Sequence, residues 1–284
     1  MIRLSAFSDE ASSSLDGQIE ALKRNGIPFT ELRGVDGVNV ADLTDKAAVE
    51  INKKLKENGI SVWSLGSPYG KVRLDDGFSE EKLFHQLDRL CRLCRIFGCD
   101  KIRVFSFYNA GGKADTVFRL LRGSVKLAAE YGVGLYHENE KDIYGEKCEQ
   151  VLELKENVPG LKFVYDPANY LQAGQSADIT LPAVFGITSY FHIKDVIAET
   201  GQLVPAGRGD GHIGDIINKV GFDTVFTIEP HLAVFDGYAQ IDGHEMKNKY
   251  RYKNNGEAFD AAVGALKTLL EENGYRYENG GYVK

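Results

Sequence analysis

Residues of the kinds that bind divalent metal ions end four short apolar segments of this 284-residue chain. They are Glu138, Asp166, His192 and Glu229. Three carboxylates that meet in a partly desolvated pocket repel one another, and a divalent cation removes this repulsion while the single imidazole completes the ligand set. Each residue taken alone would be interpreted as a helix cap or as one half of an ion pair. The four together predict a site for one divalent metal ion, which would be Mn, Zn, Co or Mg.

This prediction depends on strands that bring the four residues to one place, and the chain contains eight strand-like runs. Each run has four to seven residues and is rich in branched or aromatic side chains, as strands are. The runs cover residues 2–7, 27–32, 60–65, 101–107, 133–137, 161–165, 187–193 and 225–228. Between them, apolar residues recur at helical spacing, for example over residues 83–97, where Gly98 is expected to end the helix.

The alternation of strands and helices indicates the fold. Eight units in 284 residues are about 35 residues each, the size of one strand-plus-helix repeat. We therefore predict an α/β protein with a single domain over residues 1–284, a (β/α)8 TIM barrel. The alternative is an open doubly wound sheet, but its phosphate-binding glycines should follow the first strand, where Ser8, Asp9 and Glu10 stand instead. In a barrel, the C-terminal ends of the strands meet at one mouth, so the four candidate ligands would form a ring.

Motifs at these strand ends resemble those of a known protein family. They are Glu138-Asn139, Asp166-Pro167-Ala168-Asn169, His192-Ile193-Lys194-Asp195, Pro205-Ala206-Gly207 with Gly209-Asp210, and Ile228-Glu229-Pro230. Nearly the whole chain is similar to the sugar phosphate isomerase/epimerase family of xylose-isomerase-like TIM barrels, which includes inosose dehydratases and tagatose-type 3-epimerases. Residues 7–10 and 31–34 also resemble a bacterial branch of this family, whose members act on many substrates. The resemblance implies a mononuclear site made by the same four ligands, with Glu138 and Glu229 facing each other across the substrate carbon.

The chemistry that the resemblance implies is proton transfer next to a sugar carbonyl, and the residue types suit it. Such a reaction needs a Lewis acid on the carbonyl and the adjacent oxygen, and carboxylates that remove and return the proton. Glu138 and Glu229 are the predicted catalytic residues, each giving one oxygen to the metal and keeping the other for the proton. We expect a divalent-metal-dependent isomerase or epimerase that acts on a ketose, a sugar phosphate or a cyclitol through a metal-stabilised enediolate. If a β-hydroxyl leaves from the same enediolate, the protein is an inosose-type dehydratase, which is the alternative for this site.

Four polar residues near the expected mouth are candidates for binding the substrate: Asn169, Lys194, Arg208 and His231. Some family members carry a histidine at the position of Asn169, and an amide can still donate and accept hydrogen bonds. Arg208 would bind a phosphate or carboxylate on the substrate, unless it is only a solvated loop arginine. Lys194, like Arg33 and Lys71, has the alternative of forming a surface ion pair.

Two other patterns are assigned structural roles. Gly209, Gly211 and Gly214 have the spacing of a dinucleotide fingerprint, but they lie in a late loop, outside the βαβ unit that gives this motif its meaning. Cys91 and Cys94 fall on the apolar stripe of a helix, so we expect them in the core rather than in a metal cluster.

The composition indicates the partners and the location. With 34 Lys and Arg against 41 Asp and Glu, the net charge of -7 disfavours nucleic acid, and we expect a small carbohydrate as the partner. The sequence shows no apolar stretch long enough to span a membrane and no signal-peptide core, so we expect a cytoplasmic protein that does not associate with membranes. The long segment after the last strand, about residues 230–256, would form a lid, a subunit contact in a homo-oligomer, or a passive loop.

Two other classes of protein remain as alternatives. An endonuclease with three zinc ions shares the pair Asp210 and His212, but the third and fourth strand ends and Asn169 lack the further histidines that it needs. A metal-containing barrel could also bind a sugar without catalysis. Deuterium uptake from solvent into a bound ketose would distinguish an enzyme from such a binding protein.

Overall fold

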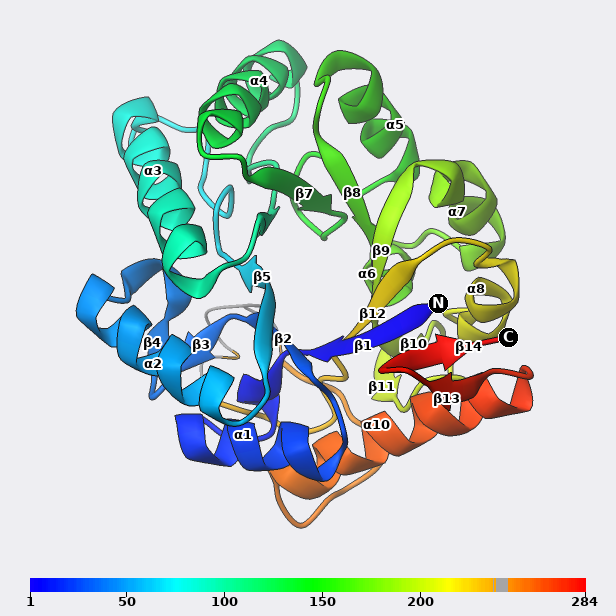
Figure 1. Cartoon of the computed structure of the whole chain (residues 1–284). Helices are drawn as coiled ribbons and strands as arrows, with labels where there is room; N and C mark the ends of the chain where they lie inside the picture. The colour runs from blue at the N-terminus through cyan, green and yellow to red at the C-terminus, as the bar shows by residue number, and fades with distance from the viewer. Residues whose placement is uncertain (237, 239–244) are drawn as a thin grey trace.

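The computed structural model describes residues 1–236, 238 and 245–284, and its centre is a closed barrel of eight parallel strands (Figure 1). The barrel strands are β1 (Ile2–Ala6), β2 (Phe29–Leu32), β5 (Ser61–Gly66), β6 (Lys101–Val104), β7 (Gly134–Glu138), β8 (Lys162–Tyr165), β9 (Thr188–Ile193) and β12 (Thr224–Ile228). Each strand pairs in parallel with the next, and β12 pairs with β1, which closes the ring. This closure confirms the predicted (β/α)8 barrel and excludes the open doubly wound sheet.

Helices surround the barrel (Figure 1). They are α1 (Leu15–Arg24), α2 (Asp45–Glu57), α3 (Glu80–Phe97), α4 (Ala114–Glu130), α5 (Cys148–Asn157), α6 (Pro167–Gln172), α7 (Ala177–Val184), α8 (Ile213–Lys219) and α10 (Asn255–Glu272), with short 3-10 helices η1 (Ser8–Glu10), η2 (Val40–Asp42) and η3 (Phe185–Ile187). Ser14, Thr44 and Ser79 cap α1, α2 and α3 by accepting a hydrogen bond from a backbone N–H of the first turn. As expected, α3 ends at Gly98, which has the left-handed φ of 74°.

One predicted strand is too long. Residues 101–107 are expected to be extended throughout, but β6 ends at Val104. The backbone N–H of Phe105 donates instead to Tyr69 in the loop after β5, and Phe107 has a left-handed φ of 73°. Both phenylalanines are buried, so their apolar character reflects the core beneath the loop and not strand pairing.

Three small hairpins, which the sequence pattern does not predict, extend the barrel. They are β3 (Gly34–Val35) with β4 (Val38–Asn39), β10 (Asp195–Ile197) with β11 (Gln202–Val204), and β13 (Arg276–Glu278) with β14 (Gly281–Val283). The first two follow the carboxyl ends of β2 and β9, so they belong to the mouth of the barrel. The third lies at the opposite end, where Tyr282 pairs with Ile2 at the start of β1.

Apolar side chains of the strands and helices form one large core cluster. Cys91 and Cys94 of α3 are free thiols with no exposed surface in this cluster, which confirms their predicted place in the core. None of the helices within the described residues combines the length and the apolar character that a membrane crossing requires.

The segment after β12 is described only in part. The loop expected at about 230–256 includes residues 237 and 239–244, which lie outside the described residues. Phe235 and Tyr238 are buried and pack against the ring of His231, and α10 begins at Asn255. Within the described part of this segment, Phe235 and Tyr238 therefore pack next to the end of β12.

Candidate metal centre

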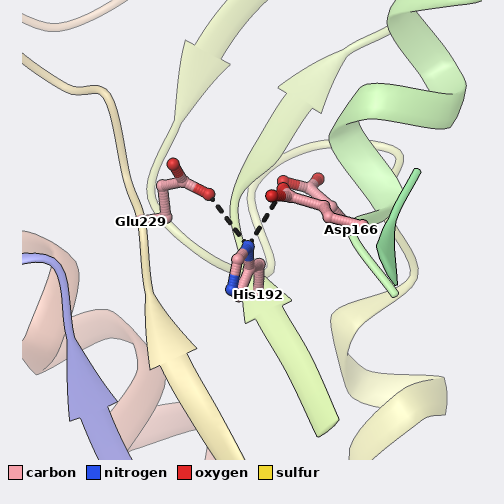
Figure 2. Close-up of side chains that lie close together, drawn as sticks. Asp166, His192 and Glu229 are labelled. Carbon is pink, nitrogen blue, oxygen red and sulfur yellow. Dashed lines mark hydrogen bonds and ion pairs between the residues drawn. The ribbon is translucent and has the colours of Figure 1, made fainter. Parts of the chain in front are cut away.

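The carboxyl ends of four neighbouring strands bring the predicted metal ligands together. Glu138 ends β7, Asp166 and Glu229 directly follow β8 and β12, and His192 lies one residue before the end of β9. Each of the four is at most 2% exposed. One ligand atom from each lies within 4.8 Å of the others. Figure 2 shows the carboxylates of Asp166 and Glu229 on either side of the His192 ring.

His192 contacts both glutamates through one ring nitrogen. Its Nδ1 lies 3.0 Å from Oε1 of Glu138 and 3.2 Å from Oε2 of Glu229. Phe7 packs edge-on against the ring, with the ring centroids 5.2 Å apart. Burial disfavours a charged imidazole, but the carboxylates of Glu138 and Glu31 outweigh it and raise the pKa of His192 well above its ordinary value.

Two buried arginines hold the glutamates on the side away from His192. Arg103 Nη1 donates to Oε2 of Glu138 at 2.6 Å, and Arg33 Nη1 donates to Oε1 of Glu229 at 2.8 Å. Both arginines are only 3% exposed, so the surface ion pair considered for Arg33 is wrong. One oxygen of each glutamate therefore faces His192, while an arginine holds the other. The role of this second oxygen in proton transfer stays a prediction, because the arginine hydrogen bond takes one of its two lone pairs.

Charged neighbours favour the ionised form of both glutamates. Burial favours the neutral acid, but His192 and Arg103 outweigh it and lower the pKa of Glu138 to about 2. Burial also opposes the charge on Glu229, and Lys194 and His192 lower its pKa well below the ordinary value. Two ionised carboxylates that face one point have the charge pattern of a divalent cation site.

Asp166 belongs to the cluster and also caps a helix. Its Oδ1 accepts a hydrogen bond from the backbone N–H of Asn169 at 3.0 Å at the start of α6, and its Oδ2 lies 2.9 Å from Nζ of Lys194. Burial raises the pKa of Asp166 to about 7 even though Lys194 opposes the rise. The side-chain amide of Asn169 donates to Oε1 of Glu138 at 3.2 Å, so Asn169 connects two of the four ligands.

The four side chains fit a divalent metal ion. Oδ2 of Asp166 and Oε2 of Glu229 are buried, and no donor in the described part of the chain gives them a hydrogen bond of regular geometry, although Lys194 and His192 lie nearby. Such buried acceptors are costly unless another partner satisfies them. Three carboxylates and one imidazole form a ligand set that suits Zn, Mn or Co. The group is therefore a candidate site for one divalent ion.

A second group of metal-competent residues, Glu10, Glu229 and His231, lies next to the first. Nε2 of His231 is 3.3 Å from Glu10 and 3.6 Å from Glu229. Arg33 already occupies the space between these carboxylates, because it lies 3.2 Å from Glu10 and binds both oxygens of Asp9. Burial raises the pKa of Glu10 to about 8, against the effect of Arg33. Arg33 thus already supplies a positive charge to the carboxylates of this second group.

Three of the four predicted substrate-binding residues contact the cluster. Asn169, Lys194 and His231 are at most 4% exposed, and each contacts a carboxylate of the set. Arg208 is exposed on the loop after β11, and its side chain contacts no residue of the described cluster. A role for Arg208 with a substrate phosphate or carboxylate stays a prediction.

Two of the three glycines that resemble a dinucleotide fingerprint, Gly209 and Gly211, donate to a carboxylate of the protein itself. Asp195 accepts backbone N–H bonds at 2.9 to 3.0 Å from Val196, Gly207, Gly209 and Gly211. A Cβ atom would lie 2.4 Å from Oδ1 of Asp195 at position 209 and 2.8 Å from it at position 211. Gly209 and Gly211 therefore form part of a cradle of backbone N–H groups around Asp195, together with Val196 and Gly207.

The residues that suggested a nuclease lie at the rim. Asp210 accepts a backbone N–H, and His212 lies 2.9 Å from Asp215. Neither belongs to a group of metal-competent residues within the described ranges. Lys71 lies 2.9 Å from Glu140, and its side chain is 9% exposed, so the surface ion pair considered for Lys71 is also wrong.

Two charged residues at this centre are absent from the sequence-based set. Arg103 and Glu31 lie inside strand-like runs, in β6 and β2, and are almost fully buried. A charge within an apolar run of a barrel strand has to be buried with a partner. That pattern is the signal that could have identified both.

A cavity of about 480 Å³ borders the centre. Its lining includes Arg33 and Arg103, which hold the two glutamates, together with Lys71, Phe105 and residues of the β3–β4 hairpin. This volume is within the range of small-molecule sites. A small ligand in the cavity would therefore contact the two arginines that hold the glutamates.

The fold and the ligand set define a β/α barrel with a buried metal-type centre, and sequence comparison identifies its family. A model of the xylose isomerase-like TIM barrel family matches residues 19–264, so the chain belongs to this family. This finding confirms the resemblance seen in the strand-end motifs. A comparison with curated proteins finds no match.

Solved structures share the fold over nearly the whole chain. D-psicose 3-epimerase in the presence of D-fructose is 15% identical with a TM-score of 0.74, and the match covers 96% of this chain and 99% of the epimerase. The IolI protein with a bound zinc atom is 15% identical with a TM-score of 0.73, covering 95% and 99%. The probable 3-DHS dehydratase AsbF of Bacillus anthracis is 16% identical with a TM-score of 0.71, covering 93% and 98%. At these identities the likeness shows the fold alone.

Proposed function

We propose that this protein is a divalent-metal-dependent isomerase or epimerase that moves a proton next to the carbonyl of a ketose, a sugar phosphate or a cyclitol. The observation that carries the proposal is the pair of glutamates, Glu138 and Glu229, both within 3.2 Å of His192 Nδ1 in a buried four-ligand set. Membership of the xylose isomerase-like family supports it. A sugar epimerase and a zinc-binding protein among the solved structures of this fold agree with it.

The chain supplies the metal ligands and the proton-transfer groups. Glu138, Asp166, His192 and Glu229 would hold the ion, whose contribution is Lewis-acid polarisation of the substrate carbonyl and its neighbouring oxygen. Glu138 and Glu229 remove the proton from the substrate carbon and return it, on the same carbon or on its neighbour. An arginine takes one lone pair of each outer oxygen, so the other lone pair of that oxygen is left for the proton.

The remaining residues bind the substrate. We assign contacts with substrate oxygens to Asn169, Lys194 and His231, and a contact with a charged substituent to Arg208. The alternative reaction is inosose-type dehydration on the same site. Lys194 favours this alternative: its buried ammonium group lies 2.9 Å from Asp166 and can give a proton to the departing hydroxyl, which then leaves as water.

Metal content is the first test. Elemental analysis of the protein after dialysis against Mn, Co, Zn and Mg should find close to one tightly held ion per chain. The His192→Ala variant should lose this ion, because the imidazole is the only nitrogen ligand of the described set. Several zinc ions per chain would support the nuclease alternative, and no ion under any condition would contradict the proposal.

Solvent exchange tests the two glutamates. With ketoses and inososes in deuterated water, the metal-loaded protein should introduce deuterium next to the carbonyl, whereas a dehydratase would release water. Glu138→Gln and Glu229→Gln should lower the exchange rate by at least about 100-fold, the usual minimum for a lost acid or base. Glu199→Gln, at an exposed position after β10, is the matched control and should leave the rate unchanged. Exchange at the normal rate in both glutamate variants would exclude the proposed mechanism.

A further inference from the structure

We propose that Glu31 is a positioning residue that holds the His192 ring with Nδ1 directed at the metal site, an inference that rests on the proposed metal-dependent function. Glu31 lies in β2 and His192 in β9, and β1 and β12 separate these strands in the sheet. The side chain of Glu31 therefore reaches across the barrel interior, where its Oε2 lies 3.2 Å from Nε2 of His192.

Two further hydrogen bonds fix the Glu31 carboxylate. The hydroxyl of Tyr190 donates to Oε1 at 2.9 Å, and the hydroxyl of Thr227 donates to Oε2 at 2.9 Å. Tyr190 also packs edge-on against the His192 ring, with the centroids 5.5 Å apart. The carboxylate thus has a single position, which its neighbours on β9 and β12 define.

The setting of Glu31 indicates that its charge acts on His192. Glu31 is 0% exposed, and a buried carboxylate is costly unless a specific partner uses it. Within the described chain, no lysine or arginine forms an ion pair with Glu31, and its one ion-pair partner is the His192 imidazole. A hydroxyl or an apolar side chain would fill this layer of the barrel at lower cost. Metal binding by His192 explains why a carboxylate stands there.

The contact decides which nitrogen of His192 can bind a metal ion. When Nε2 carries a proton and donates it to Glu31, the lone pair of Nδ1 points to Glu138 and Glu229, 3.0 and 3.2 Å away. Metal-binding histidines generally donate their other ring N–H to such a partner, which fixes the ring and makes it a better ligand. Loss of the partner typically lowers metal affinity by about 10- to 100-fold.

The test is zinc affinity, measured on the full-length protein by competition with a chromophoric chelator. Glu31→Gln should raise the Kd for zinc by about 10- to 100-fold. Thr227→Val is the matched control, because it removes a hydrogen bond to the same oxygen of Glu31 but leaves the contact with His192. It should change the Kd much less. Equal zinc affinity in wild type and Glu31→Gln would overturn the proposal.

A spectroscopic readout separates positioning from a purely structural role. In zinc-loaded protein labelled with 15N-histidine, the His192 signals should show a proton on Nε2 and none on Nδ1. Glu31→Gln should shift or broaden the Nε2–H signal. A purely structural role would lower the free energy of unfolding and leave both the zinc Kd and this signal unchanged, and a proton on Nδ1 in the zinc-loaded wild type would contradict the proposal directly.

A second variant keeps the test decisive if Glu31→Gln does not fold. Glu31→Asp keeps the charge but is one methylene shorter, so it should fold, lose the contact with Nε2 and bind zinc more weakly. If the wild type binds no zinc at all, the proposed function itself fails. If the wild type binds zinc and Glu31→Asp binds it equally well, only the role of Glu31 is refuted.

Discussion

The two buried arginines determine what each glutamate oxygen can do. Arg103 and Arg33 each bind one oxygen of a glutamate, and the other oxygen of Glu138 and of Glu229 faces His192. The arginines thus pair with both carboxylates in a buried place, while one oxygen of each carboxylate faces the same point. Removing one arginine leaves an uncompensated charge, and breaking a buried pair in this way usually costs about 3–5 kcal/mol, on the order of a third of a domain's stability.

Replacing Arg103 should therefore have a large effect on stability. We expect Arg103→Met to lower the free energy of unfolding by about 3–5 kcal/mol in urea denaturation. Added zinc should restore part of this loss, because a cation beside Glu138 replaces the missing charge. Arg119→Met is the control, because Arg119 forms an exposed pair with Glu80 and should cost about 1 kcal/mol or less. Similar losses in the two variants would show that the Arg103 pair has no special energetic role.

At the scale of elements, the loop after β11 is built around Asp195. Four backbone N–H groups converge on this carboxylate, which begins β10 two residues after the end of β9. The cradle connects the glycine-rich loop to the strand that carries His192. Burial raises the pKa of Asp195, and the hydrogen bonds from Gly209 and Gly211 oppose the rise.

Replacement by alanine should change the free energy of unfolding differently at Gly209 and at Gly214, two glycines of the same segment. At Gly209 a Cβ atom would lie 2.4 Å from the Asp195 carboxylate, so Gly209→Ala should lower the free energy of unfolding by about 1–3 kcal/mol. At Gly214, inside α8, a Cβ atom meets nothing within 4 Å, so Gly214→Ala should be neutral or stabilise by up to about 1 kcal/mol. Chemical denaturation of both variants measures the difference. Hydrogen exchange of the Gly211 amide should become faster in Gly209→Ala and not in Gly214→Ala. Equal exchange rates and equal stabilities in the two variants would refute a stabilising role of the cradle.

For the whole molecule, the metal centre joins strands that are far apart in the chain. Its ligands come from β7, β8, β9 and β12, and β12 closes the barrel by pairing with β1. An ion bound to all four would connect half of the eight barrel strands. It would also offset three buried carboxylates in a chain whose net charge is already -7.

Metal binding should therefore stabilise the entire fold. After treatment with a chelator, zinc or manganese at 100 times its Kd should raise the free energy of unfolding by about 2.7 kcal/mol, and the melting temperature should rise with ion concentration. His192→Ala lacks one ligand, so added metal should raise its free energy of unfolding much less. The melting temperature of this variant in the presence of chelator is the reference for that comparison. A rise of the same size in His192→Ala would show that the ions act elsewhere.

The sequence alone determined the barrel and the four candidate ligands. Strands and helices alternate with clear apolar periods, and a parallel barrel places the residues after its strands at one mouth, so strand order by itself groups Glu138, Asp166, His192 and Glu229. The end of β6 was misplaced because Phe105 is buried in a loop, and burial gives the same apolar signal as a strand.

Only the tertiary structure decided which side chains meet inside the barrel. A two-residue period tells which residues point inward, but closure, register and side-chain rotamers set the distance between residues on non-adjacent strands, such as Glu31 and His192. For the same reason the sequence did not show that Arg33 and Arg103 bind the glutamates, or that Arg208 stays outside the cluster. Strand order and hydrophobic pattern are local properties of the chain, whereas a buried charge network depends on distances that exist only after the ring has closed.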